Sequence, residues 1–290
     1  MVTRIKEILI EAGKVVMNNL KQKLKLICLL CLLGGFASSA YAQCEAKNEA
    51  FLPGEEVSYD LFFNWRFVWT KAGLATLSFD ETIYKGKPAY KIDLIAAGNK
   101  TADFFFKLRD TLTSVVSHKL EPIYFRKGAI EGKRYWVDEA FFTHKDGVSY
   151  VTQKRLDHRG NTHYFEHNDS RCIHDMLSIL ARARSFDPTT FKVGHRISFP
   201  MTTGKRVEEQ YLVYRGKEEF RAEDKNIYKC LLFSFVERKD GKDVEVITFY
   251  ITDDKNHLPV RLDLFLNFGS AKAFLKEVKG NRYPLTSIKK

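Results

Sequence analysis

The sequence predicts a mainly β protein, in which antiparallel meanders form a curved sheet or a partly open barrel or sandwich, with one short mid-chain helix at about residues 170–184. Two observations predict this class. Apolar residues alternate with polar ones in many short segments that Gly, Asn and Asp turns separate, as expected for strands with one buried face. The segment DSRCIHDMLSILARARSF instead carries apolar residues at helical spacing, so it is the expected helix.

Residues 1–42 have the layout of an upstream extension followed by a secretory signal peptide. A basic stretch precedes an apolar core at residues 26–36, and small residues follow up to Ala42. The core is shorter than the roughly 20 residues that a transmembrane helix needs, and cleavage is expected after Ala42. We therefore expect a periplasmic or secreted chain that begins at about Gln43 and has no transmembrane anchor.

The first expected strand runs from Val57 to Thr70. Seven successive odd-numbered positions in it are apolar, and these are Val57, Tyr59, Leu61, Phe63, Trp65, Phe67 and Trp69. Because side chains alternate between the two faces of a strand, all seven are expected on one face, opposite Arg66. The stretch is long for one strand, so we expect a bend or a break near Asn64-Trp65. Gly73 then marks a turn or a close approach of two backbones.

The rest of the chain repeats the strand pattern. Tyr84-Lys85-Gly86-Lys87-Pro88 and Lys239-Asp240-Gly241-Lys242 are expected turns between neighbouring strands. Further strands are expected at residues 90–96, 110–118, 123–129, 134–143, 148–156, 162–167, 197–201, 207–214, 228–237, 244–252, 260–267 and 271–278.

The expected helix divides the chain after the signal peptide. The predicted organisation is an N-terminal β half at residues 43–169, the helix at 170–186 and a C-terminal β half at 187–290, although the halves can also form one continuous domain. Asp169 or Ser170 is a candidate N-cap, and Asp175 could cap the first turn as an acid beside the helix dipole. The helix is expected either as a hinge between the halves or as a plug on a curved sheet.

Charge and cysteine content limit the function classes. The chain has a net charge of +11, and residues 1–42 hold six Lys/Arg and two Asp/Glu, a net +4, so the remainder carries +7. These bases are scattered, so no nucleic-acid partner is expected. After cleavage Cys44, Cys172 and Cys230 remain, which permits one disulfide and one thiol outside the cytoplasm. The sequence leaves the pairing open.

No motif of catalysis or metal binding stands out, so the sequence favours a protein that is not an enzyme, and no cofactor is predicted. His163, His167 and His174 are weak candidates for a metal site. On one strand, His163 and His167 would be roughly 13 Å apart, which is too far for two ligands of one zinc ion. Solvated histidines are the favoured interpretation, and a hydrolase without a recognisable motif is the third function hypothesis.

Aromatic residues are the best candidates for a binding surface. Trp65, Phe67, Trp69, Tyr135 and Trp136 are predicted to contact an apolar or glycan ligand of the cell envelope, although aromatic side chains also fill ordinary β cores. The first hypothesis is therefore a non-catalytic module that binds a lipid, a glycan or another envelope component. The alternative is a structural or assembly protein that acts through contacts with other envelope proteins.

Three segments together resemble a known family. They are PGEEVSYDLFFNWRFVWTKAGLATLSF, CIHDMLSILARARSF and FYITDDKNHLPVRLDLFLNFGSAKAFLKEVKG. In this combination the chain resembles the bacterial domain-of-unknown-function family 3108, in its Bacteroidetes form, from about Phe51 to Gly280. The resemblance implies an exported envelope protein rich in antiparallel β-structure. It supplies no catalytic or binding residues.

Overall fold

The computed structural model describes residues 44–65, 68–100, 108–131, 134–266 and 269–289, which belong to one compact unit. The expected signal peptide, with its cleavage site at Ala42, lies outside the described residues. The strands before the helix are β1 (Glu55–Trp65), β2 (Val68–Tyr84), β3 (Lys87–Gly98), β4 (Leu108–Val116), β5 (Pro122–Glu131), β6 (Arg134–Lys145), β7 (Val148–Leu156) and β8 (Thr162–Asp169). After the helix α3 (Met176–Ala183) and the 3-10 turn η1 (Pro188–Thr190) come β9 (Arg196–Thr202), β10 (Val207–Arg221), β11 (Ile227–Lys239), β12 (Lys242–Thr252), β13 (Pro259–Leu266) and β14 (Gly269–Lys279).

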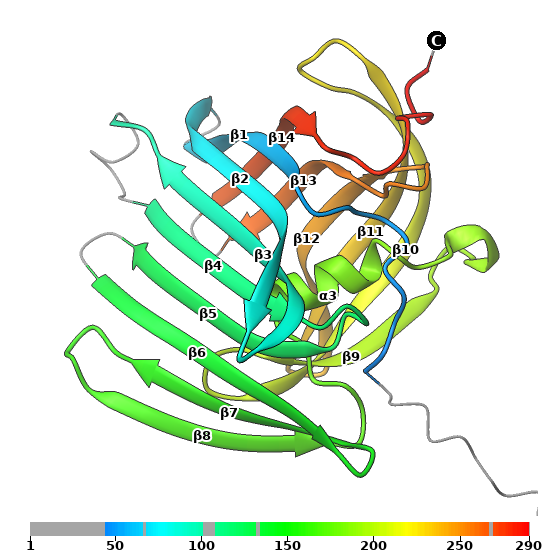
Figure 1. The fold of residues 1–290 in the computed structure, drawn as a ribbon. Coiled ribbons are helices and arrows are strands. Elements are labelled where there is room, and N and C mark those ends of the chain that lie inside the picture. Colours follow the sequence, from blue (N-terminus) through cyan, green and yellow to red (C-terminus); the bar gives the residue numbers. More distant parts are fainter. Residues whose placement is uncertain (1–43, 66–67, 101–107, 132–133, 267–268, 290) are drawn as a thin grey trace, which may run out of the picture. The chain divides into compact units, whose positions relative to one another are not determined.

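The fourteen strands of the described residues join one antiparallel sheet that curves into a nearly closed, barrel-like form (Figure 1). Their order is β8-β7-β6-β5-β4-β3-β2-β1-β14-β13-β12-β11-β10-β9, so β1 pairs with β14 and links the strands before the helix to those after it. The predicted fold class is confirmed. Short polar turns explain the meander, because neighbouring antiparallel strands need only tight connections.

Side-chain and backbone contacts join β8 and the residues just after it to the other end of the sheet, formed by β9 and β10. Arg171, just after β8, forms two hydrogen bonds of 2.8 and 2.7 Å with the carboxylate of Glu209 on β10. His167 on β8 bonds through Nε2 to the Lys205 carbonyl oxygen at 3.1 Å. His174 also forms an isolated parallel bridge with Met201 of β9. These contacts hold the curved sheet together where strand pairing ends.

The expected turns have the backbone that tight hairpins require. Lys85-Gly86, between β2 and β3, has φ values of 48° and 78°, and Asp240-Gly241, between β11 and β12, has 50° and 75°. Two successive residues with positive φ define the type I′ turn, whose twist matches that of the flanking strands. Both turn predictions are confirmed.

The break expected near Asn64-Trp65 is confirmed, but the placement of all seven odd-numbered residues from Val57 to Trp69 on one face is wrong. β1 ends at Trp65 and β2 begins at Val68, and the two pair antiparallel, so the chain reverses direction between them. Cross-strand pairing places Trp69 opposite Asn64, and paired residues share a face. Trp69 therefore lies on the face of the sheet opposite to that of Val57 and Tyr59, because the reversal ends the alternation on which the prediction depended.

Gly73 confirms the other expectation for this region, a close approach of backbones. A Cβ at Gly73 would overlap the Ala97 carbonyl oxygen on β3 and lie 2.9 Å from the Gly98 Cα. The register of β1 and β2 also shifts between Leu61 and Phe62. Glycine therefore allows β2 and β3 to approach closely beside a bulge.

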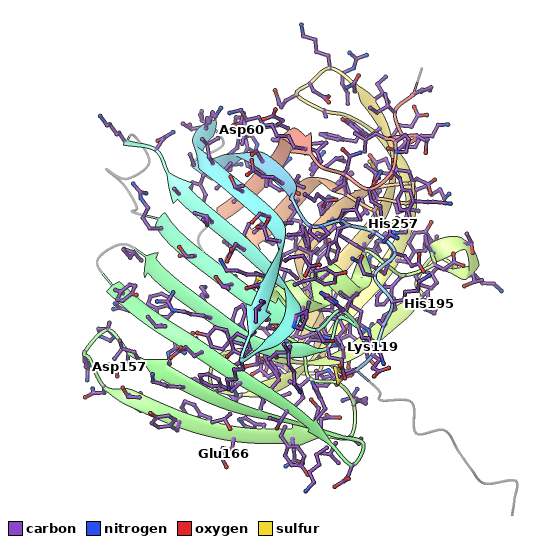
Figure 2. All side chains as sticks on the ribbon, in the orientation of Figure 1. Asp60, Lys119, Asp157, Glu166, His195 and His257 are labelled. Atoms are coloured by element: carbon purple, nitrogen blue, oxygen red, sulfur yellow. A yellow bond between two sulfur atoms is a disulfide. The ribbon has the colours of Figure 1, made fainter. Side chains whose placement is uncertain are left out.

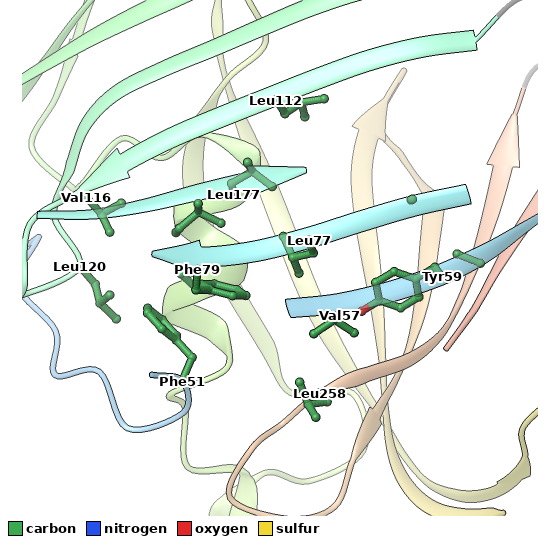
Figure 3. Close-up of a cluster of buried hydrophobic side chains, with 14 of the residues drawn as sticks. Phe51, Val57, Tyr59, Leu77, Phe79, Leu112, Val116, Leu120, Leu177 and Leu258 are labelled. Atoms are coloured by element: carbon green, nitrogen blue, oxygen red, sulfur yellow. The ribbon is translucent and has the colours of Figure 1, made fainter. Parts of the chain in front are cut away.

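The helix is a plug inside the curve of the sheet. Its N-terminal half contributes Leu177 to a core that includes Val57, Leu77 and Leu112 from β1, β2 and β4 (Figure 3). The other buried members of this core are Phe51, Tyr59, Ala75, Phe79, Ile92, Val116, Leu120, Phe125, Ala140, Phe142, Val151, Ile173, Ala181, Ala222, Tyr228, Cys230, Leu258, Val260, Ala273 and Leu275. The strands before and after the helix therefore share one core.

The helix begins later than the sequence predicts. Its N-cap is Asp175, whose side chain accepts hydrogen bonds from the Leu177 and Ser178 backbone N–H groups at 2.9 Å. The predicted N-cap at Asp169 or Ser170 is wrong, because β8 continues to Asp169. The expectation that Asp175 caps the first turn is confirmed. Among the described residues, no helix is long and apolar enough to cross a membrane.

Candidate functional site

An apolar pocket lies between the helix and the strands that follow it. Its cavity volume is about 100 Å³, and the empty space reaches about 830 Å³ when the open mouth is counted. The helix side contributes Met176, Ile179, Leu180 and Ala183. The facing wall is formed by β9 to β12 and includes the aromatic residues Phe199, Phe233, Phe235 and Phe249. A cavity needs roughly 10–15 Å³ for one water molecule, so this one has room for a larger group.

Strand alternation explains the apolar wall. On β11, Leu231, Phe233 and Phe235 occupy every second position and line the pocket. On β12, Ile247, Phe249 and Ile251 do the same and pair with them across the two strands. Residues two apart share a face of a strand, so these six side chains form one continuous apolar surface.

The N-terminus of α3 is fixed by a buried polar network. Ser114 on β4 donates a hydrogen bond of 2.9 Å to Asp175 Oδ2, while Asp175 Oδ1 caps the helix. The Ser178 hydroxyl completes a capping box by accepting from the Asp175 backbone N–H at 3.0 Å. Burial raises the pKa of Asp175, and the hydrogen bonds from Ser178 and Ser114 oppose this effect. The network holds one end of the helix against β4.

The C-terminus of α3 is fixed by a buried ion pair. Arg184 donates from Nη1 to Glu55 Oε1 at 2.5 Å, and both side chains are almost wholly excluded from solvent. Nε and Nη2 of Arg184 donate to the Asn256 carbonyl oxygen at 3.1 and 2.9 Å. The guanidinium also lies 5.0 Å from the centre of the Phe79 ring. Although Arg184 borders the pocket, its donors are therefore directed at protein atoms.

His257 is the other titratable residue that lines the pocket. Its Nδ1 lies 2.6 Å from the Arg184 carbonyl oxygen. A carbonyl oxygen only accepts hydrogen bonds, so Nδ1 carries the proton, and in neutral His257 the Nε2 atom is an acceptor. The pocket border thus offers an imidazole acceptor and an already paired guanidinium, while the rest of the lining is apolar.

A disulfide ties the N-terminal segment to the chain just before the helix. Cys44 and Cys172 are bonded, with Cα atoms 4.9 Å apart. Arg182 of α3 donates to the Cys44 carbonyl oxygen at 2.6 Å, so the same segment contacts the helix directly. The pairing that the sequence left open is therefore settled. Cys230 is the free thiol, and burial raises its pKa to about 12.

The aromatic residues predicted to bind a ligand do not form one site in the described part of the chain. Phe67 and the side chain of Trp65 lie outside the described residues. Trp69 is exposed on β2, with the Lys272 ammonium 4.7 Å from the centre of its ring. Tyr135 is exposed near the start of β6, and Trp136 is half-buried with Lys127 6.0 Å above its ring. Three strands separate β2 from β6, and neither strand lines the apolar pocket.

The weak metal candidates are also dispersed. His163 bonds to Asp157 at 3.0 Å in an exposed hairpin, labelled at Asp157 in Figure 2. His167 contacts a backbone carbonyl oxygen, as described above. His174 is buried beside Ser178, and burial lowers its pKa to about 3. Within the described residues, no three His, Cys, Asp or Glu side chains are grouped closely enough to hold a metal ion.

The apolar wall of the pocket is visible in the sequence as alternation in two expected strands, although the predicted ligand-binding aromatics lie elsewhere. The strands at 228–237 and 244–252 were expected, and alternation alone places Phe233 with Phe235 and Ile247 with Phe249 on shared faces. The sequence could not show that the plug helix leaves these faces partly uncovered. The aromatic residues near Trp65 predicted a binding surface on β1 and β2, whereas the apolar pocket lies beside β9 to β12.

A solved structure of another protein shares the barrel-like architecture. A β-barrel-like protein of the domain of unknown function DUF1849 from Brucella abortus matches with a TM-score of 0.54 and 11% identity, over 79% of this chain and 98% of that one. A Bacteroides fragilis protein with a YmcC-like fold, provisionally named as exported, matches at 8% identity over 81% of this chain and 99% of its own, with a TM-score of 0.32. No curated protein matches the chain.

The family assignment comes from the sequence itself. The model of the family described as "Protein of unknown function (DUF3108)" matches residues 58–276. This range extends from β1 to β14 and includes the helix and all residues that line the pocket. Since the match covers more than half of the sequence, the chain belongs to the DUF3108 family, as the resemblance implied.

Proposed function

We propose that this protein binds an apolar, chain-like ligand, such as the acyl chain of a lipid, in the pocket between α3 and β9 to β12. The observation that carries the proposal is the composition of this pocket, whose open lining is apolar except for its Arg184 and His257 border. Apolar surface that stays in contact with water is unfavourable, at roughly 25 cal/mol per Å². A hydrocarbon that displaces this water gains that free energy.

The polar border favours an uncharged group over an anion in the pocket. Arg184 already directs Nε, Nη1 and Nη2 at Glu55 and the Asn256 carbonyl oxygen. Its positive charge is therefore balanced before any ligand enters. A glycan would need several hydrogen-bonding partners, because buried polar groups without partners are costly. The lining supplies few of them, so a lipid fits this pocket better than a glycan.

We also propose that the protein acts outside the cytoplasm. The disulfide between Cys44 and Cys172 is of the kind that persists in oxidising compartments. The signal-peptide layout of residues 1–42 supports the same location. A binding role is favoured over catalysis, because Arg184 and His257 are the titratable side chains of the lining and both are bonded to protein atoms.

Mass spectrometry of organic extracts from freshly purified protein tests the proposal directly. We expect a co-purified lipid, and uptake of the fluorescent apolar probe N-phenyl-1-naphthylamine by protein from which lipid has been removed. Ile247→Trp should lower both, because the larger side chain fills the pocket wall. Ile83→Trp is the matched control, since Ile83 is exposed on β2, away from the pocket. Empty extracts together with equal probe uptake by the two variants would refute the proposal.

A further inference from the structure

Two neighbouring hairpins end in a rim of exposed apolar side chains. The β1–β2 and β13–β14 hairpins lie side by side, because β1 pairs with β14 (Figure 1). Near their ends the register forms one row across four strands, in which Trp69 is opposite Asn64, Asn64 is opposite Ser270 and Ser270 is opposite Phe265. Residues in such a row share a face. Trp69 and Phe265 therefore lie on the same face, roughly 14 Å apart at the usual strand spacing.

The opposite face of the same rim is apolar too. Val68 precedes Trp69 and Leu266 follows Phe265, so both lie on the other face of their strands. We call Val68, Trp69, Phe265 and Leu266 the apolar rim. Their exposed fractions are 63%, 40%, 50% and 38%. In the described part of this sheet edge, exposed apolar side chains therefore lie on both faces.

Positive charge accompanies the rim. The Lys272 ammonium lies 4.7 Å from the centre of the Trp69 ring. Lys71, close by on β2, is paired at 2.8 Å with Asp60, whose position on β1 is labelled in Figure 2. Asp263, opposite Lys272 in the register, is bound by Arg261 at 2.5 Å. The nearby acids are thus neutralised by other bases, and Lys272 adds a positive charge beside an exposed indole.

We infer that the apolar rim inserts into the surface of a lipid bilayer that contains anionic lipids. A protein partner with a flat surface would cover one face of this edge and leave the other in water. Acyl chains and head groups surround an inserted edge, so they cover Trp69 and Phe265 on one face and Val68 and Leu266 on the other. Tryptophan is enriched at the head-group level of membranes, and a lysine beside it can reach lipid phosphates.

This inference is independent of the apolar pocket, because no rim residue lines it. Vesicle flotation of the purified protein tests it, using vesicles of phosphatidylcholine alone and vesicles that also contain phosphatidylglycerol. We expect the wild type to float with the phosphatidylglycerol vesicles. Trp69→Ser/Phe265→Ser should lower this binding about a hundredfold, because each of the two large apolar side chains that enter the bilayer contributes about a factor of ten.

Two matched variants distinguish insertion of the apolar rim from nonspecific adsorption of the protein to vesicles. Ile83→Ser removes an exposed apolar residue next to the β2–β3 turn, at the other end of β2, and should leave binding unchanged. Lys272→Glu keeps the rim intact and should lower binding to the anionic vesicles about fivefold, which tests the inference even if the double variant does not fold. Ile83→Ser and Lys272→Glu should both retain the lipid bound in the pocket. A failure of the membrane inference can therefore be told apart from a failure of the proposed lipid binding.

Three outcomes would overturn the inference. The first is that the folded wild type stays at the bottom of the gradient with both kinds of vesicle. The second is that Ile83→Ser weakens binding as much as the rim variant does. The third is that the wild type forms a dimer which the Trp69→Ser/Phe265→Ser variant does not, without vesicle binding by either, because the rim is then an interface between two copies of the chain.

Discussion

Arg184 at the end of α3 and Glu55 at the start of β1 form an ion pair in the protein interior, with Nη1 and Oε1 2.5 Å apart. The side chains are 1% and 0% exposed. The pair joins residues 129 positions apart in the sequence and places the helix in the curve of the sheet. The position of the plug, and with it the width of the pocket, depends on this contact.

Breaking the buried pair from one side should strongly destabilise the fold. Glu55→Ala leaves the Arg184 guanidinium buried without its counter-ion, which typically costs about 3–5 kcal/mol. Urea unfolding followed by circular dichroism measures the change in free energy of unfolding. The double variant Glu55→Leu/Arg184→Met should be more stable than Glu55→Ala, because it removes both charges. A single variant that unfolds at the wild-type urea concentration would contradict this.

Acidification should destabilise the protein through His174. Burial lowers its pKa to about 3 from the ordinary value of 6.5, so the folded state holds the neutral imidazole where the unfolded state already binds a proton. Stability is therefore complete above pH 6.5 and falls as the pH decreases toward about 3. At pH 5 the expected loss is about 2 kcal/mol.

His174→Gln isolates this effect. Urea unfolding at pH 7.5 and at pH 5 should show a smaller loss in the variant than in the wild type, because glutamine does not titrate. Asp175 acts in the opposite direction, since burial raises its pKa and favours the protonated folded state at low pH. Its contribution is present in both proteins and cancels in the comparison. Equal losses in wild type and variant would show that His174 is not held neutral by the fold.

Removal of the disulfide should lower stability by about 2–5 kcal/mol, because the bond closes a long loop and restricts the unfolded chain. The bonded residues Cys44 and Cys172 are 128 positions apart. Cys44→Ala/Cys172→Ala should unfold at a lower urea concentration than the oxidised wild type. Dithiothreitol should bring the wild type down to the level of the variant and leave the variant unchanged. A variant that dithiothreitol destabilises further would point to a different disulfide.

Gly73→Ala should destabilise the sheet by roughly 1–3 kcal/mol, the usual cost of forcing extra volume into a packed site. The added Cβ would meet the backbone of Ala97 and Gly98, which cannot swing aside. Gly128→Ala is the matched control on β5, where the nearest atoms belong to the flexible Arg126 side chain at 3.0 Å. Thermal unfolding should separate the two. Equal melting temperatures for both variants would argue against the close approach of β2 and β3.

Much of the fold could be predicted because strands and turns are encoded locally. Alternation across β11 and β12 predicts two strands with apolar faces, and Asp240-Gly241 predicts the turn between them. The cap of the helix is likewise local, since the Oδ1 atom of Asp175 accepts from the nearby backbone N–H groups of Leu177 and Ser178. The alternation from Val57 to Trp69 misled the prediction, because a tight reversal between Trp65 and Val68 leaves the apolar pattern almost unbroken.

The sequence by itself determined the antiparallel β class, the presence of a mid-chain helix, the family and the residues available for a disulfide. Only the tertiary structure decided that the helix plugs the sheet, that Cys44 pairs with Cys172, and that the uncovered apolar surface lies on β9 to β12. The physical reason is distance along the chain. Alternation and caps arise between neighbours, whereas a pocket depends on which faces a distant helix covers. Here the buried contacts of Arg184 with Glu55 and of Asp175 with Ser114 hold that helix in place.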